Sequence, residues 1–326
     1  MRKDLSIYAV LIAFIAVGFV CVVPAMATDG DEIVPYRAIF PVCGNPADQM
    51  YSDVSGNRVV WQDYRNGNWD IYMYDLSTGT ERAICTASGG QYSPRIDGNR
   101  IVWQDERNGD ADIYMYDLST GTETRVCSNG YDQTSPRIDG DRIVWTDMRN
   151  GNSDIYMTDL NYGYQVPICT APGIQSWVEI DGDRIVWTDL RNGNYDLYMY
   201  DLSTGTETLI AAGSGYYVSA DISGNYIVSE EGSRSDIFLY DLSTGTRSAI
   251  CTARGDQHAP KIDGNQIVWF DSRDSDYDIY SYDISSGVET AICTVPGNKQ
   301  VPQVDNGKVV WMDQRSGNWD IYLYVP

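Results

Sequence analysis

Histidine is nearly absent from this chain of 326 residues, in which His258 is the only one. Metal sites built from several histidines are therefore excluded, and we find no Ser-His-Asp spacing, glycine-rich phosphate loop or clustered His/Cys set, so no cofactor is expected. Basic residues are also scarce, since 23 Lys and Arg face 46 Asp and Glu and leave a net charge of -23. Such a surface repels nucleic acid and acidic lipid headgroups, which argues against both as partners.

Helical periodicity is missing as well, because no stretch after residue 27 repeats apolar residues at helical spacing. The one long apolar run, Ile7–Val23, follows two basic residues and precedes "AMA" ending at Ala27. This pattern is typical of a signal peptide at residues 1–27, and it predicts a secreted or cell-surface chain. Residues 1–27 hold two basic residues and one acidic residue, so the chain from Thr28 carries a net charge of -24. The alternative is a retained membrane anchor, since 17 residues are at the short end of what spans a bilayer.

A repeat fills the rest of the chain. The sequence "IVW" or a close variant recurs at spacings of 42, 42, 42, 42, 40 and 42 residues, at Val59, Ile101, Ile143, Ile185, Ile227, Ile267 and Val309. Between copies, segments that alternate in twos are separated by turn sequences such as "RNGN", "STGT" and "DGNR". In the second period, the alternating segments predict four short strands, near residues 93–97, 100–105, 112–118 and 124–128.

Four strands in about 40 residues are typical of a β-propeller blade. The chain ends after a third strand and begins with a lone fourth-strand sequence at Ile39–Cys43, in which Cys43 lies 42 residues before Cys85. We therefore predict an all-β fold: one monomeric, seven-bladed propeller domain over residues 28–326, with four-stranded antiparallel blades. The N-terminal strand completes the last blade, and closing the ring leaves no sheet edge exposed.

The repeat "IDGNRIVWQDxRNGNxDIYMYDLSTGTE" resembles the TolB-type propeller repeat, in which a Pro-Asp-Gly turn, a strand, Asp-x-Arg, a Gly-containing hairpin and an Asp-Ile-Tyr strand follow one another. The resemblance covers nearly all of the chain after residue 27. In this form, within an acidic exported chain, it is similar to cell-surface propeller proteins of methanogenic archaea. It implies a propeller fold and a place at the cell surface.

Two recurring residue types are expected to serve packing. One Trp per blade stands in step with the buried Ile and Val, which favours packing between blades over a ring of sugar-stacking platforms, at Trp61, Trp103, Trp145, Trp187, Trp269 and Trp311. Six cysteines share one outer-strand position, filled by Ala211 in the remaining blade: Cys43, Cys85, Cys127, Cys169, Cys251 and Cys293. Equivalent points on neighbouring blades are too far apart for disulfides, so we expect small buried hydrophobic residues and a reducing habitat.

The hairpin sequence "DxRNGNxD" pairs an Asp with an Arg two residues later, as in Asp63 and Arg65. Residues two apart on a strand share a face, so carboxylate and guanidinium can meet. Calcium is the alternative, because oxygen ligands at alternating positions beside a Gly wrap that ion. The basic third position and the missing bidentate Glu argue against calcium.

Function is expected where the copies differ, which is mainly in the loops from each fourth strand to the next first strand. These loops share one end of the ring with the "RNGN" hairpins, and we predict that this end binds a ligand. Its first strands begin with a polar position that forms either a collar around the channel mouth or ties for the loops: Gln49, Gln91, Gln133, Gln175, Tyr217, Gln257 and Lys299. Four residues after each polar position, neighbouring blades place side chains of opposite charge, which suggests ion pairs between blades, at Asp53, Arg95, Arg137, Glu179, Asp221, Lys261 and Gln303.

Blade five is the most irregular copy. Its "SEEGSRSD" lacks the Trp, shortens the hairpin by two residues and adds two acids, with aromatic residues and the one histidine nearby: Glu230, Glu231, Trp177, Tyr216, Tyr217 and His258. A groove for a sugar or a peptide is one interpretation, and drift of a degenerate repeat is the other.

The sequence leaves two functions open, one a binding role and the other an enzymatic one. The favoured one is a non-enzymatic binding module, part of the cell envelope, that presents its variable end to an envelope protein, a peptide or a glycan. The rival is a polysaccharide lyase or hydrolase with a site at the channel mouth, since oligogalacturonate lyases have a similar ring. Glu230 and Glu231 offer carboxylates for acid–base work, but adjacent strand residues point to opposite faces.

Overall fold

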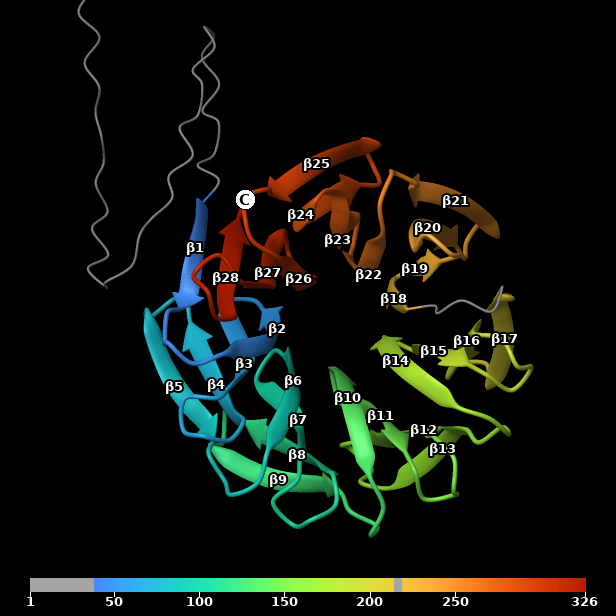
Figure 1. Cartoon of the computed structure of the whole chain (residues 1–326). Coiled ribbons are helices and arrows are strands. Elements are labelled where there is room, and N and C mark those ends of the chain that lie inside the picture. The colour runs from blue at the N-terminus through green and yellow to red at the C-terminus, as the bar shows by residue number, and fades with distance from the viewer. Residues whose placement is uncertain (1–37, 214–218) are drawn as a thin grey trace, which may run out of the picture.

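The computed structural model describes residues 38–213 and 219–326. Within these ranges all regular elements are strands, and 28 of them form seven four-stranded antiparallel sheets arranged in a ring, as Figure 1 shows. The predicted fold is confirmed. The predicted signal sequence and the predicted site residues Tyr216 and Tyr217 lie outside the described residues. No helix in the described ranges has the length and hydropathy to span a membrane.

Blades one to four each use four consecutive strands. Blade one has β2 (Gln49–Ser55), β3 (Arg58–Asp63), β4 (Asp70–Asp75) and β5 (Thr80–Cys85). Blade two has β6 (Gln91–Asp97), β7 (Arg100–Asp105), β8 (Asp112–Asp117) and β9 (Thr122–Cys127). Blade three has β10 (Gln133–Asp139), β11 (Arg142–Asp147), β12 (Asp154–Asp159) and β13 (Gln165–Cys169). Blade four has β14 (Gln175–Asp181), β15 (Arg184–Asp189), β16 (Asp196–Asp201) and β17 (Thr206–Ala211).

Blades five to seven complete the ring. Blade five has β18 (Ala220–Ser223), β19 (Tyr226–Glu231), β20 (Asp236–Asp241) and β21 (Thr246–Cys251). Blade six has β22 (Gln257–Asp263), β23 (Gln266–Asp274), β24 (Asp276–Asp283) and β25 (Val288–Cys293). Blade seven joins β26 (Lys299–Asp305), β27 (Lys308–Asp313) and β28 (Asp320–Val325) to β1 (Ala38–Cys43).

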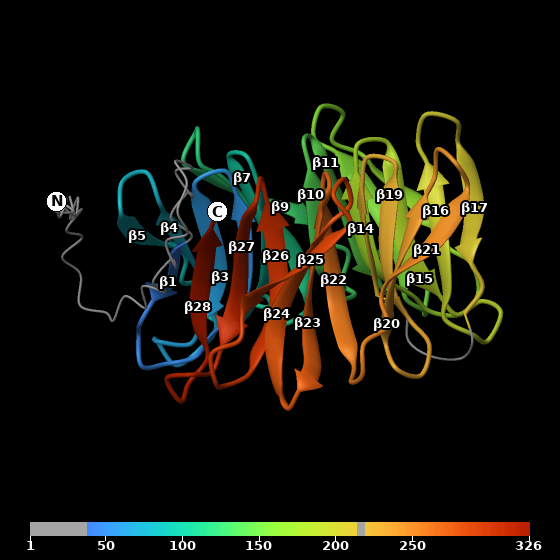
Figure 2. The same ribbon diagram turned by 90° about the horizontal axis from the view of Figure 1, so that it is seen from above.

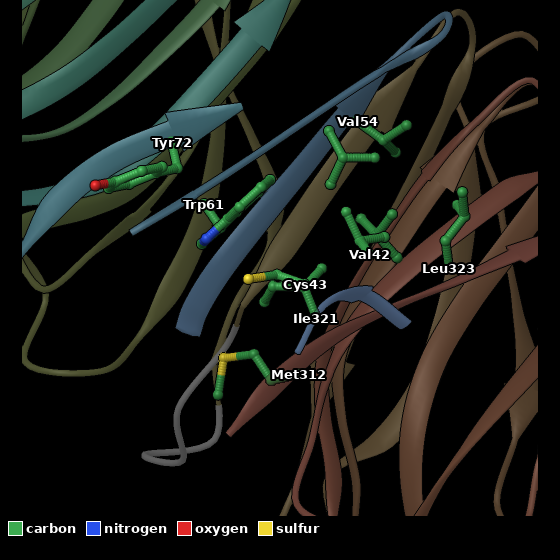
Figure 3. Packing of buried hydrophobic residues seen from close by; sticks show 10 residues of the cluster. Val42, Cys43, Val54, Trp61, Tyr72, Met312, Ile321 and Leu323 are labelled. Atoms are coloured by element: carbon green, nitrogen blue, oxygen red, sulfur yellow. The ribbon is translucent and has the colours of Figure 1, made fainter. Parts of the chain in front are cut away.

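The two ends of the ring meet in blade seven. Strand β1 pairs antiparallel with β28, from Ala38 opposite Val325 to Cys43 opposite Ile321, and the two strands lie side by side in Figure 1. Figure 3 shows the core beneath this pairing, where Val42 of β1 and Leu323 of β28 face Trp61 of blade one. The N-terminal strand therefore completes the last blade, as predicted, and leaves no open gap between blades seven and one.

The core is divided into seven clusters, one at each interface between neighbouring blades. At the interface of blades one and two, Val60 and Ile71 of one blade pack against Ile101 and Trp103 of the next. All six recurring Trp side chains are fully buried, which confirms that they pack between blades. Alternation along each strand supplies both faces of a blade with apolar side chains, so each sheet is covered on both sides.

The strands run between two faces of the ring, seen from the side in Figure 2. We call one the loop face; it contains the hairpins between second and third strands and the loops that lead from each outer strand to the next blade. The turn face contains the turns between first and second and between third and fourth strands. On the turn face, the backbone N–H of Gly140 donates to Asp97 Oδ2 of the preceding blade at 2.7 Å, and Gly182 donates to Asp139 in the same way. Equivalent bonds recur round the ring and fix the spacing of the blades.

Candidate functional site

The loop face is held rigid by backbone hydrogen bonds. In blade one the N–H of Tyr64, the first hairpin residue, donates to the carbonyl of Asp48 in the adjacent loop at 3.0 Å, and the other blades repeat this bond. The N–H of Gln91 donates to Trp69 O of the preceding blade at 2.8 Å. Side chains on this face are therefore displayed from a fixed backbone, which lowers the entropy lost when a ligand binds.

Glu230 and His258, two of the predicted site residues, are brought together across the interface of blades five and six. His258 Nδ1 lies 2.9 Å from Glu230 Oε1, and Glu230 is buried while a quarter of the His258 side chain stays exposed. The other oxygen of Glu230 accepts the N–H of Ala259 at 3.0 Å. The hydrogen bond from Glu230 raises the pKa of His258, because it stabilises the imidazolium form.

The Glu230 position has a structural role in other blades. Gln62 of blade one holds the same strand position and accepts the N–H of Ser93 in blade two at 2.9 Å. Blade five keeps this link between blades with one carboxylate oxygen and uses the second oxygen to orient His258. The His258 ring also packs against Phe270 and Tyr277, with ring centroids 5.2 and 5.9 Å apart. The imidazole of His258 is therefore partly exposed and has a fixed orientation.

Glu231 points elsewhere and belongs to the packing of blade five. In blade one, Arg65 of the hairpin bonds Asp63 and also Glu81 of the outer strand. Blade five has Ser233 at the position of this Arg, and the next residue of its hairpin, Arg234, is exposed. Its outer strand carries Arg247 opposite Tyr240, where blade one has Glu81 opposite Tyr74. Arg247 Nη2 lies 2.7 Å from Glu231 Oε2, so the ion pair with the outer strand is kept by an exchange of charge, and Glu231 stands at the position of Asp63. The sequence predicted that the two glutamates diverge, but the exchange was missed.

The predicted polar positions are buried and do not form an exposed collar. The side chains have no exposed surface at Gln49, Gln91, Gln133, Gln175, Gln257 and Lys299. Gln257 Nε2 donates to Gly255 O of its own loop at 2.9 Å, and Lys299 Nζ bonds Gly297 O at 2.6 Å and Asp278 of blade six at 3.0 Å. A buried amide or ammonium needs such partners, so these side chains hold the loops in place. Other residues make the surface that a ligand would touch.

Charged side chains near the ring axis form the predicted ion pairs. Arg137 Nε lies 2.6 Å from Glu179 Oε2, and Glu179 also bonds Lys261, which comes from two blades further on. Burial would raise the pKa of Glu179, but Arg137 and Lys261 hold it well below its usual range. Burial raises the pKa of Asp221. Lys261 offsets this rise only in part, since its Nζ lies 3.8 Å from Asp221 Oδ1. The contact between blades four and six shows that these side chains reach past the innermost strand of blade five.

The hairpin carboxylates are committed to protein donors. Asp105 Oδ2 accepts Trp103 Nε1 at 2.8 Å and Arg107 Nη2 at 2.6 Å, and its Oδ1 accepts Arg107 Nε at 2.8 Å. In blade one, Asp70 at the far end of the hairpin accepts hydrogen bonds from the side-chain amides of Asn66 and Asn68. The Arg guanidinium thus lies against the carboxylate that a calcium ion would need. Among the described residues, no group of three or more His, Cys, Asp or Glu is arranged to hold a metal ion.

The six cysteines of the described residues are buried free thiols, as predicted, but they are more than apolar filling. Arg107 Nη2 of blade two donates to Cys85 Sγ of blade one at 3.0 Å, and equivalent bonds link the other five pairs. Ala211 replaces the Cys where the following blade lacks the hairpin Arg. Burial raises the pKa of the Cys85 thiol to about 12, so it stays protonated and unreactive.

Exposed apolar side chains gather on the loop face. Six of the ten large exposed hydrophobic residues in the described ranges lie there, along an arc from blade one to blade four: Tyr51, Tyr64, Tyr131, Met148, Ile174 and Trp177. Trp177 is 49% exposed and lies on β14, at a strand bulge where six of the blades place a residue with positive φ. The sequence singled out only Trp177, since the other five stand singly in loops, strand bulges and hairpins where no periodic pattern marks them. We call these six residues the apolar arc.

These features define the chain as a seven-bladed β-propeller that is closed by its own N-terminal strand. A family model described as the TolB beta propeller domain matches residues 50–216, just over half of the chain. The chain therefore belongs to the TolB β-propeller family. No curated protein matches it in a sequence comparison.

Three solved structures show the likeness of fold. The β-propeller domain of the Trilobed protease from Pyrococcus furiosus has a TM-score of 0.67 and 14% identity, over 85% of this chain and 93% of that one. The oligogalacturonate lyase from Vibrio parahaemolyticus has a TM-score of 0.63 and 13% identity, over 95% and 99%. The Pyrococcus horikoshii acylaminoacyl peptidase has a TM-score of 0.67 and 16% identity, over 85% of this chain and 51% of its own. The chain thus spans about half the length of that peptidase, and at these identities the likeness is one of fold alone.

Proposed function

We propose that this chain is a non-enzymatic binding module of the cell envelope, and that its loop face binds another protein or an extended peptide. The observation that carries this proposal is the apolar arc. Partner-binding patches are enriched in Tyr, Trp and Met, and five of the six exposed side chains of the apolar arc are of these types. Tyr131 and Met148 lie on adjoining segments, because the N–H of Met148 donates to the carbonyl of Asp132 at 3.0 Å.

The arc ends at blade five, where the surface changes character. Trp177 of β14 stands on one side of β18, and the Glu230–His258 pair stands on the other. An aromatic side chain and an oriented, titratable donor at one end of an apolar arc supply the directional contacts that set the register of a bound partner. A glycan is the second ligand class for this end, since Trp177 offers an exposed ring beside polar groups.

Two further observations support a place outside the cytoplasm. Residues 1–27 have the pattern of a signal peptide, and the net charge of -23 keeps such a protein soluble in salty surroundings. Free thiols at six positions suit a reducing habitat.

An enzyme is the less supported alternative. The oligogalacturonate lyase fold is shared, and His258 with its carboxylate partner is the arrangement that general acid–base catalysis uses. Glu231 is tied to Arg247, however, and does not converge on His258 as a second catalytic carboxylate. The geometry therefore supports a binding role better than a hydrolytic one.

The test compares two sets of substitutions that remove exposed apolar surface. One variant carries Tyr131→Ser, Met148→Ser and Ile174→Ser on the loop face, and the matched control carries Leu209→Ser and Val288→Ser on outer strands, where the side chains are exposed to a similar degree. Each is used to capture partners from an envelope extract after cross-linking. We expect the loop-face variant to lose a partner that the wild type and the control retain. Equal capture by all three proteins would overturn the proposal.

A further inference from the structure

Two turns of the turn face depart from the repeat, and only that of blade three carries aromatic residues. Blade six has Asp-Ile-Ser-Ser-Gly-Val at 283–288. Four blades carry Asp-Leu-Ser-Thr-Gly-Thr between their third and fourth strands, at residues 75–80, 117–122, 201–206 and 241–246. In blade one the hydroxyls of Thr78 and Thr80 lie 2.7 Å apart, and the other three turns repeat this contact. Blade three has Asp-Leu-Asn-Tyr-Gly-Tyr at 159–164, which replaces both threonines with Tyr162 and Tyr164.

The two tyrosines are displayed and not packed. Tyr162 is 71% exposed and Tyr164 is 60% exposed, and their ring centroids lie 5.9 Å apart with the planes tilted by 39°. Blade three also has Thr158 where blade one has Tyr74. Tyr74 is partly buried, so a ring that filled its space would be less exposed than Tyr162 or Tyr164. Four other turns fold with two threonines, so folding does not require the aromatic pair.

A polar cavity of about 210 Å³ lies in the same part of the turn face. It is lined by Asp139, Gly140, Asp141, Arg142, Asp159 and Asn161, the last of which precedes Tyr162 in the chain. Asn161 Nδ2 donates to Asp141 Oδ2 at 3.0 Å, and Arg142 Nη1 lies 2.7 Å from Asp183 Oδ1. Asp141 is also held by Arg100 at 2.5 Å. The lining groups are thus fixed by one another and present carboxylate, amide and guanidinium edges.

We propose that the turn of blade three is a second binding site, and that it takes a neutral oligosaccharide. The apolar C–H face of a sugar ring would stack on Tyr162 or Tyr164, and its hydroxyls would bond the carboxylates and amide of the cavity. A cavity of 210 Å³ falls below the roughly 300–1,000 Å³ that drug-sized ligands occupy, which suits a single sugar ring. Three of the six lining residues are aspartates and the whole chain is acidic, so an anionic sugar or a nucleic acid is disfavoured.

A protein partner fits this site less well than a sugar. A stable protein interface buries about 800 Å² on each side, and two tyrosines beside a small cavity supply only a fraction of that area. Of the other described large exposed hydrophobic residues, Val288 begins an outer strand at the turn face, at the place that Tyr164 holds in blade three. The rest lie on the loop face or on an outer strand. The proposal is independent of the loop-face function, because it uses other residues on the opposite face.

The experiment measures the affinity of the mature chain for cellotetraose, maltotetraose, mannotetraose and chitotetraose by calorimetry. The double variant Tyr162→Thr/Tyr164→Thr restores the threonine pair of the other blades and is expected to fold normally. The matched control, Thr78→Ala/Thr80→Ala, changes the same positions in blade one. An unchanged unfolding midpoint in both variants shows that any loss of affinity is local.

We expect at least one tetrasaccharide to bind with a millimolar or lower dissociation constant, and its affinity to fall at least tenfold in the double variant but not in the control. The proposal is overturned if none of the four binds, or if the double variant binds as the wild type does. It is equally overturned if the double variant instead loses a cross-linked protein partner, since that result would make the tyrosine pair a protein contact.

Discussion

At the residue scale, one buried carboxylate in each regular blade organises three neighbours. Asp105 orients the Trp103 indole and the Arg107 guanidinium, and that guanidinium reaches Cys85 on the preceding blade. A Cys occurs wherever the following blade has this Arg, and Ala211 stands before blade five, which lacks it. The thiol therefore serves as a hydrogen-bond acceptor between blades, which explains why it is repeated although all six cysteines of the described residues are free.

Replacing Cys85 with Ala should lower the free energy of unfolding by about 1–2 kcal/mol, because Arg107 Nη2 loses an acceptor and a small cavity forms. Ala211→Cys is the matched control and should stay within about 0.5 kcal/mol of the wild type, since Ser233 stands in blade five at the position of the donating Arg. Urea unfolding followed by Trp fluorescence measures both. Equal effects of the two substitutions would contradict the acceptor role of the thiol.

His258 should make the stability of the interface between blades five and six depend on pH. Its pKa is raised in the folded state, so protonated His258 stabilises the fold fully below about pH 6.5, and this contribution is lost as pH rises through the folded pKa. His258→Gln, the residue at the equivalent place in blade seven, should therefore destabilise the protein more at about pH 5.5 than at about pH 8.5. Thermal unfolding at both values measures the difference. A cost that is the same at both pH values would show that the ion pair with Glu230 contributes nothing.

At the element scale, a blade tolerates large changes in sequence if its contacts with its neighbours survive. Blade five has lost the Trp, the hairpin Arg and two hairpin residues, yet Ser229 Oγ and Arg247 still meet Glu231. Strand β18 spans four residues, where the first strands of the other blades span seven. The contacts in the middle of blade five therefore remain, while its loop end differs from that of the other blades. The loop end is where a binding surface would arise.

The strand β1 is the element on which closure depends. A chain that begins at residue 44 should lose at least about 4 kcal/mol of stability relative to one that begins at residue 38, because Val42 and Cys43 leave the core and β28 becomes an unpaired edge. Urea unfolding and size-exclusion chromatography measure stability and self-association. If both chains unfold at the same urea concentration and both remain monomeric, β1 does not carry the closure.

At the scale of the whole molecule, contacts between protein groups hold the ring together, at the hairpins as well as in the core. The hairpin carboxylates face Trp, Arg and Asn donors. Addition of calcium or of EDTA should therefore shift the unfolding midpoint by less than about 1 °C, since about 1 kcal/mol shifts the midpoint of a domain of this size by roughly 1.5–2 °C. Differential scanning calorimetry gives this directly. A calcium-dependent rise of several degrees would make the hairpins ion sites.

The sequence predicted the architecture because a 42-residue period and a lone N-terminal strand are properties of the backbone that spacing records. It could not predict the site, because that depends on which side chains meet across an interface. The Gln positions have the same spacing whether they are buried or exposed. The Glu230–His258 pair joins residues 28 positions apart on different blades, and the Arg247 exchange is invisible without strand register. Tyr162 and Tyr164 lie on the turn face, for which the sequence pattern predicted no site.

The central claim is that the repeat builds the ring and that departures from it on the loop face bind a partner. The most direct test places a photo-cross-linking amino acid singly at residues 64, 131 and 174 of the loop face and at residues 78 and 288 elsewhere, in cells that export the protein. We predict that the three loop-face positions yield a product with the same polypeptide and that the other two do not. Products that are absent, or that arise equally from both groups of positions, would contradict the account.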